Sequence, residues 1–168
     1  MSTANSTVNF DALDACHQQI QRHLTELATL AQQIEIDGVN ATAQQQAADI
    51  EAFFSGTSRQ HHQEEEKNVF PLLLSSGDAD LAAAVRSLQQ DHGWIEENWL
   101  ELAPQLRAIA LGNSWYESAE FQHGVQVFLE LVGDHIALEE SLIYPESKAR
   151  WAQVMASRAE RANQATAD

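Results

Sequence analysis

The sequence predicts an all-α protein, an antiparallel up-down-up-down four-helix bundle with a short extra helix near its C-terminal end. Hydrophobic residues recur at steps of three and four over four long stretches. Short turn signals separate these stretches, at Gly38, at Ser75 to Gly77 and at Gly112. Glycine and proline are otherwise scarce, and no useful stretch alternates in the manner of a strand. Four long helices joined by turns of a few residues favour neighbours that run antiparallel.

The four helices are expected over residues 9–37, 40–75, 78–112 and 114–145. Asn9 is a good N-cap for the first, and Ser114 with Glu117 has the spacing of a capping box for the fourth. Pro71 should kink or end the second helix, because proline lacks an amide hydrogen. We expect one domain over 1–168, with a core of about 9–147 and a short helix over 148–162 packed on the bundle.

Charge and composition exclude several partners. The formal net charge is −16 and the pI is near 4.6, so a nucleic-acid backbone or an anionic membrane would repel the chain. No stretch approaches the roughly 20 apolar residues of a membrane span, and Met1 to Asn9 lack the features of a secretory signal. We therefore expect a cytoplasmic protein with no nucleic-acid or membrane partner, present as a monomer or weak homodimer.

Two similar stretches suggest metal binding. In the first, His62 is followed four residues later by Glu66 and then by Val-Phe-Pro; in the second, His135 is followed by Glu139 and then by Ile-Tyr-Pro. Residues four apart lie on the same face of a helix. Each stretch can therefore aim an imidazole and a carboxylate at one point, which suits iron, manganese or zinc.

Four histidines occupy hydrophobic positions at one depth in the predicted bundle. His17, His62, His92 and His135 each lie 20 to 22 residues from the same end of their helices, which is about 30 Å at helical rise. One histidine on an apolar face is usually a satisfied core residue. Four at one level, with glutamates a turn away, predict a metal site, because so many buried ionisable groups are costly without one.

The remaining candidates fit this site less well. His61 points about 100° away from His62 and is expected beside the site or at a helix contact. His23 lies on the flank of the first helix, and His123 is too far along the fourth helix to reach the same centre. Glu140, next to Glu139, is a weak candidate ligand.

The motifs resemble the hemerythrin-like, or HHE cation-binding, family over about residues 9–147. They are a histidine on the first helix, HHQEEE with FP on the second, DH on the third, and HIALEE with YP on the fourth. The resemblance implies two iron ions in a non-haem di-iron centre, bridged by two carboxylates and an oxo or hydroxo group. It makes His17, His62, His92 and His135 terminal ligands and Glu66 and Glu139 the bridges.

One departure concerns the third helix. Oxygen-carrying hemerythrins have a second histidine four residues after the first one there, whereas this chain has Glu96. Glu96 can be a substitute ligand, an acid beside the site or the wall of a water-filled pocket, and we place it in the ligand set. The predicted metal ligands are His17, His62, Glu66, His92, Glu96, His135 and Glu139.

Other kinds of protein remain open at this point. Ferritin-like di-iron bundles use a Glu-x-x-His motif on two helices, and only Glu120 with His123 matches it. Zinc usually takes a closed four-ligand site, and a metal-free interaction module leaves the buried histidines unexplained. The predicted function is binding or sensing of oxygen or another diatomic ligand such as nitric oxide. The alternatives are an enzyme that handles peroxide or nitric oxide, or an iron storage or repair protein.

Overall fold

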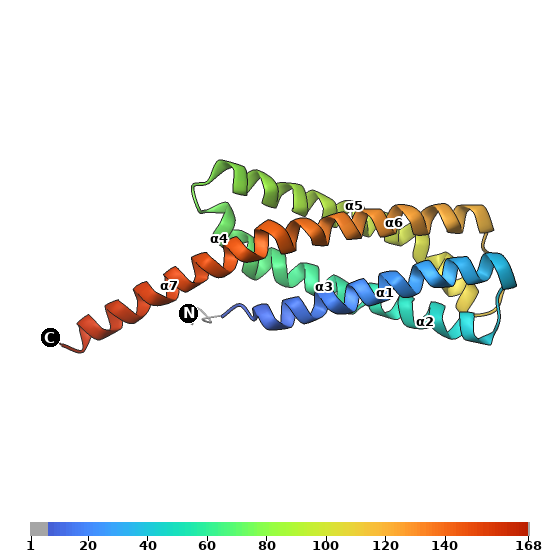
Figure 1. Cartoon of the computed structure of the whole chain (residues 1–168), viewed down its shortest axis with the longest axis horizontal. Coiled ribbons are helices and arrows are strands. Elements are labelled where there is room, and N and C mark those ends of the chain that lie inside the picture. The colour runs from blue at the N-terminus through green and yellow to red at the C-terminus, as the bar shows by residue number, and fades with distance from the viewer. Residues whose placement is uncertain (1–6, 168) are drawn as a thin grey trace.

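The computed structural model describes residues 7–167, and all regular structure within that range is helical, with no strand. Figure 1 shows helices that run side by side along the molecule and one that continues beyond the others. The elements are α1 (Phe10–Asp37), α2 (Ala41–Ser55), α3 (Thr57–Glu64), η1 (Glu65–Val69), α4 (Phe70–Leu74), α5 (Ala79–Ala110), α6 (Ser118–Leu138), η2 (Glu139–Ile143) and α7 (Tyr144–Ala165).

The ends of α1 and α5 confirm the sequence prediction. The Asn9 side chain accepts a hydrogen bond from the amide of Ala12, and the Asp78 side chain accepts one from Leu81, as N-caps do. Gly38, after α1, has φ 72°, a backbone conformation that only glycine adopts at little cost.

The predicted second helix is interrupted at Gly56 and again by the π-helical turn η1. Gly56 separates α2 from α3, and its amide bonds back to the carbonyls of Ala52 and Phe53. The fourth helix also begins later than predicted: residues 113–117 are not helical, and the Glu117 side chain caps α6 by accepting from Ala119 and Glu120. Ser114 is therefore not the cap, because a carboxylate nearer to the helix satisfies the free amides.

Two short π-helical turns, η1 and η2, occupy equivalent places in the chain. η1 begins at Glu65 and η2 at Glu139, and each is followed by an aromatic residue and a proline. Proline has no amide to give to the carbonyl four residues before it, and a wider turn absorbs that defect. Pro71 and Pro145 thus do not stop the helical chain, which continues as α4 and α7.

The interior consists of two apolar clusters with a polar layer between them. α1 and α5 each pack against both α2 and α6. On α1, Leu13 belongs to one cluster and Ile20 to the other, and His17 lies between them. On α5, His92 lies in the same way between Leu88 and Ile95. The helices therefore bring polar side chains to one level and seal that level above and below.

The C-terminal segment differs from the prediction. It is helical, but α7 continues the line of α6 as one rod that projects past the other helices (Figure 1). Lys148 pairs with Asp14 and Trp151 packs against an apolar cluster, but most residues after Trp151 are exposed, so only the start of the segment is packed on the other helices. None of the helices in residues 7–167 combines the length and apolar character of a membrane span. Of Met1 to Asn9, used above to predict location, the first six lie outside the described residues.

Candidate metal centre

The polar layer holds a compact cluster of histidines and glutamates from every side of the bundle. His17 comes from α1 and His61 from α3, and Glu65 and Glu139 are the first residues of the two π-helical turns. With His135 of α6, these side chains are almost completely buried. His62 of α3 and His92 of α5 lie at the edge of the cluster and are partly exposed, the His92 side chain by 10%. Their ligand-type atoms form three overlapping groups, each close enough together to hold one metal ion.

One group, the inner half-site, contains His17 and His61 with both glutamates. His61 Nε2 lies 2.9 Å from Glu65 Oε1, and His17 Nε2 lies 3.0 Å from Glu139 Oε2 and 3.6 Å from Glu65 Oε1. Both imidazoles are buried. The inner half-site therefore offers two imidazole nitrogens and two carboxylate oxygens in an enclosed position.

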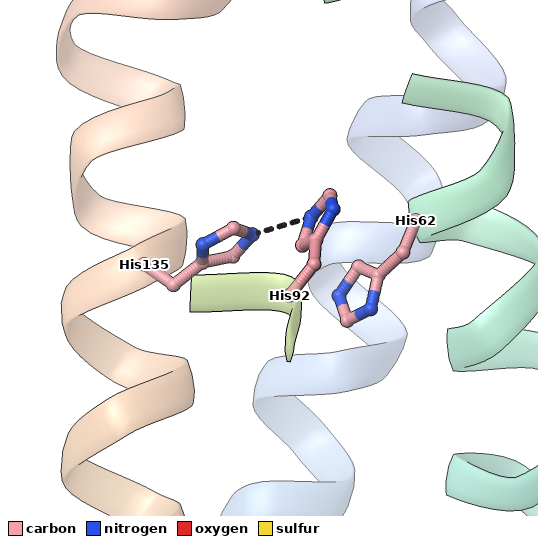
Figure 2. A group of neighbouring side chains, drawn as sticks. All are labelled: His62, His92 and His135. Carbon is pink, nitrogen blue, oxygen red and sulfur yellow. Dashed lines mark hydrogen bonds between the residues drawn. The ribbon is translucent and has the colours of Figure 1, made fainter. Parts of the chain in front are cut away.

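The outer half-site contains His62, His92 and His135, which converge from three helices in Figure 2. The Nε2 atoms of His92 and His135 lie 3.1 Å apart. Glu65 Oε2 is 3.4 Å from His92 Nε2, and Glu139 Oε1 is 3.0 Å from His135 Nε2. This side has one imidazole more than the inner half-site, and two of its three imidazoles are partly open to solvent.

The residues fit a pair of metal ions. Each glutamate turns one oxygen toward the inner half-site and the other toward the outer one. Within the described chain, Glu65 Oε2 and both oxygens of Glu139 accept no well-aligned hydrogen bond although imidazole nitrogens lie near them. Buried carboxylate oxygens without partners are costly. A cation placed between the groups would satisfy these oxygens. The lone pairs of the carboxylate oxygens and of the nearby imidazole nitrogens point to one place, where they can bind a metal ion but cannot hydrogen-bond to one another.

The protonation of the cluster reflects its negative charge. Burial would lower the pKa of His17, but Glu139 and Glu65 raise it to about 9. Burial would raise the pKa of Glu65, but hydrogen bonds from His17 and other histidines hold it well below its usual range. Burial and the neighbouring His92 lower the pKa of His62. Protons on the inner histidines thus offset the buried carboxylates, and cations can take that role.

Two predicted ligands lie outside the cluster. Glu66 Oε1 lies 2.8 Å from His92 Nδ1, and Glu66 Oε2 accepts a hydrogen bond from Gln89. Glu66 therefore fixes the direction of the His92 ring from the side opposite the cluster. Glu96 forms a bidentate ion pair with Arg59 near the surface. Neither Glu66 nor Glu96 belongs to one of the groups of ligand-type atoms, whereas Glu65, which was not predicted as a ligand, belongs to two of them.

The difference between the predicted Glu66 and the grouped Glu65 is a shift of one residue. His62 was aligned with His135, whereas the structure makes His61 the counterpart of His135: each precedes the first residue of a π-helical turn by four positions. The prolines indicate the correct alignment in the sequence. Pro71 follows Glu65 by six residues, as Pro145 follows Glu139, but Pro71 follows Glu66 by only five. His61 and Glu65 were therefore missed, and His62 is an additional histidine in the outer half-site.

The other polar candidates have plain structural roles. Glu140 lies 3.2 Å from His17 Nδ1, behind that ring as Glu66 lies behind His92. His23 is buried, stacks on Phe53 and bonds the carbonyl of Gln19, as a satisfied core histidine does. His123 is exposed on α6.

A tyrosine that the sequence did not single out completes the inner half-site. Tyr144, the first residue of α7, is buried, and its hydroxyl donates to Glu65 Oε1 at 2.5 Å. Burial, together with the charges of Glu65 and Glu139, raises the pKa of Tyr144. The phenol therefore keeps its proton and remains a donor.

The outer half-site borders a surface pocket. Its lining includes Arg59, His62, Lys67, His92 and Glu96. The pocket reaches the cluster where its histidines are partly exposed. Small solutes can therefore approach the outer histidines from solvent, whereas the inner ones are enclosed.

An all-helical chain with a buried cluster of this composition belongs to the class of metal-binding helical proteins. A family model described as the hemerythrin HHE cation-binding domain matches residues 8–147, so the chain belongs to this family and is a cation-binding protein. It is also similar to an uncharacterized protein of Haemophilus influenzae, with 27% identity over 132 residues, 79% of this chain and 74% of that protein.

Proposed function

We propose that the protein holds two iron ions, one in each half-site, and binds or senses oxygen or another small diatomic ligand there. The observation that carries this proposal is the division of both carboxylates between the half-sites. Glu65 and Glu139 each present one oxygen to His17 or His61 and the other to His92 or His135. A single metal ion needs no such division, whereas two metals bridged by carboxylates do.

The proposed ligand set is five imidazoles and two bridging carboxylates. It consists of His17, His61, His62, Glu65, His92, His135 and Glu139. The inner half-site has one imidazole fewer, so it leaves a coordination position for a small ligand. Iron bound there supplies one-electron chemistry to such a ligand. We further propose one domain whose four helical segments run alternately up and down, since that order brings these residues to one level.

The protein's own side chains position the site and exclude water. Glu140 and Glu66 lie behind His17 and His92, at the Nδ1 atoms, and fix the direction of the rings. The apolar clusters on either side of the polar layer keep bulk water from the inner half-site. A dry, preorganised site favours binding of a small uncharged molecule over hydrolysis or leakage of protons.

The alternative function is an enzyme that turns over peroxide or nitric oxide. The buried Tyr144 hydroxyl favours it, because a fixed hydrogen-bond donor beside the inner half-site can stabilise charge that develops on a reacting peroxide or nitric oxide. A carrier does not consume its ligand, so turnover separates the two functions.

The test begins with iron-loaded, reduced protein under anaerobic conditions. Its absorption spectrum is recorded before air is admitted, after air is admitted, and after the gas is pumped off again. Reversible appearance and loss of charge-transfer bands supports gas binding, and lasting bleaching with consumption of added peroxide supports the enzyme. Glu65→Ala should show no bands, whereas the exposed His123→Ala should behave as wild type. An iron-loaded wild-type chain without any response to air or peroxide contradicts both functions.

A further inference from the structure

Both shared glutamates and one histidine of each half-site come from a repeated stretch of eleven residues. Residues 61–71 and 135–145 each contain a histidine, a glutamate four residues later and an aromatic-proline pair after a π-helical turn. Phe70 and Tyr144 are therefore equivalent positions. Phe70 stacks on His92 with ring centroids 5.6 Å apart, and Tyr144 stacks on His17 at 4.7 Å. Each aromatic ring thus covers one histidine of one half-site.

At the equivalent aromatic positions, Tyr144 carries a hydroxyl group that Phe70 lacks. The Tyr144 hydroxyl donates to Glu65 Oε1, the oxygen that faces His61, and lies 3.1 Å from His17 Nε2. Phe70 is completely buried and has no group that can donate to Glu139. One bridging glutamate therefore receives a phenol hydrogen bond on its inner oxygen, and the other receives none from the equivalent position.

We propose that Tyr144 is a positioning residue that makes the two half-sites unequal by weakening Glu65 Oε1 as a metal ligand on the inner side. This inference rests on the proposed function. A donated hydrogen bond draws electron density from a carboxylate oxygen, and an inner metal ion with a weaker anionic ligand is easier to reduce. Hydrogen bonds to ligand atoms are a recognised means by which proteins set reduction potentials.

Burial strengthens this effect. Tyr144 and Glu65 are both shielded from solvent, so water cannot replace the phenol as a donor when the hydroxyl is removed. Hydrogen bonds to charged groups are the stronger kind, and a dry surrounding makes them stronger still. The same bond fixes the carboxylate plane, which keeps the two oxygens of Glu65 directed at the two half-sites.

The experiment measures the first reduction potential of the iron-loaded protein in Tyr144→Phe, with Tyr116→Phe as the matched control. The chain has two tyrosines, and Tyr116 lies away from the cluster, against Phe121. In a second arm, 3-fluorotyrosine is incorporated into Tyr116→Phe protein, so that position 144 alone carries a more acidic, stronger donor. We expect the potential to fall in Tyr144→Phe, to rise with fluorotyrosine, and to stay unchanged in the control.

Shifts of the reduction potential in opposite directions, down in Tyr144→Phe and up with fluorotyrosine, are specific to hydrogen bonding. If the ring only filled space, the strength of its hydroxyl as a donor would not affect the potential. Anything other than opposite shifts overturns the proposal; if Tyr144→Phe holds no iron, the fluorotyrosine protein decides alone. Iron content is measured first. A wild-type chain that binds no iron contradicts the proposed function, whereas iron binding with an unmoved potential contradicts only the role of Tyr144.

Discussion

The inner and outer half-sites share two glutamates but differ in their surroundings. The inner half-site has two buried histidines, His17 and His61, and a buried phenol that donates to Glu65. The outer half-site has three histidines, two of them partly exposed beside a surface pocket. A repeated sequence motif therefore builds one enclosed position and one that solvent can reach. The difference teaches that a pair of similar stretches can support unequal chemistry through a few substituted side chains.

The largest effect is expected from the shared carboxylates. Glu65→Ala should remove most iron from both half-sites, because it deletes one oxygen ligand from each. Glu66→Ala is the matched control one residue away. It should keep iron, with affinity lowered about tenfold through the loss of support behind His92. Iron per purified chain, measured by elemental analysis, checks both variants. Equal iron loss in the two variants would contradict the assignment of Glu65 over Glu66.

Single-histidine variants should separate the half-sites. His61→Ala removes an inner ligand and His62→Ala an outer one, so each variant should lose about one of two irons. The Mössbauer spectrum of His61→Ala should retain the signal of the outer iron, and that of His62→Ala should retain the signal of the inner iron. His123→Ala, on the exposed face of α6, serves as the control. Loss of the same iron signal from both variants would break the division into an inner and an outer half-site.

Removing the metal should destabilise the fold by a moderate amount. Without cations, the buried oxygens of Glu139 have imidazole nitrogens 3.0 Å away but accept no well-aligned hydrogen bond. A metal present at 100 times its dissociation constant adds about 2.7 kcal/mol to the free energy of unfolding. For a chain of this size, the melting temperature should fall by about 5 to 10 °C on chelation. Calorimetry before and after chelation checks this, and an unchanged melting temperature speaks against a metal in the buried layer.

The smallest effect is expected at the pocket rim. Arg59 and Glu96 pair beside the outer histidines, and their side chains are each more than a third exposed, so the pair adds little stability. Arg59→Ala should leave iron content unchanged but speed removal of the outer iron by a chelator. The inner iron should leave at the wild-type rate. Stopped-flow release kinetics measure both phases, and equal acceleration of the two phases would show that the pocket does not serve the outer side.

Much of the fold could be predicted from the sequence. The cap at Asn9 and the turn at Gly38 depend on local chemistry, and the structure has them as predicted; the third predicted helix also begins at its expected place, where Asp78 is the cap. The C-terminal segment could not be placed in the same way. Its helical character is local, but whether α7 packs on the other helices depends on the direction of α6, because the chain continues in that direction through Pro145 in the first turn of α7 (Figure 1).

The site was predicted only in part, because helical phase decided the ligands. His17, His62, His92, His135 and Glu139, which were predicted from their positions on the helices, all lie in the cluster. Ideal phase, however, favoured Glu66 over Glu65 and set His61 aside, whereas the structure directs His61 to the inner half-site and His62 to the outer one. Tyr144 was missed because an aromatic residue in an apolar stripe reads as core, and its hydroxyl matters only once Glu65 faces it.

The most direct test of a bridged metal pair is the iron content of the purified chain, combined with its Mössbauer spectrum. We expect about two irons per chain, magnetically coupled through shared ligands and in two distinct environments. Glu65→Ala should abolish the coupling. One metal per chain, zinc alone, or two uncoupled irons would contradict the division of Glu65 and Glu139 between two half-sites.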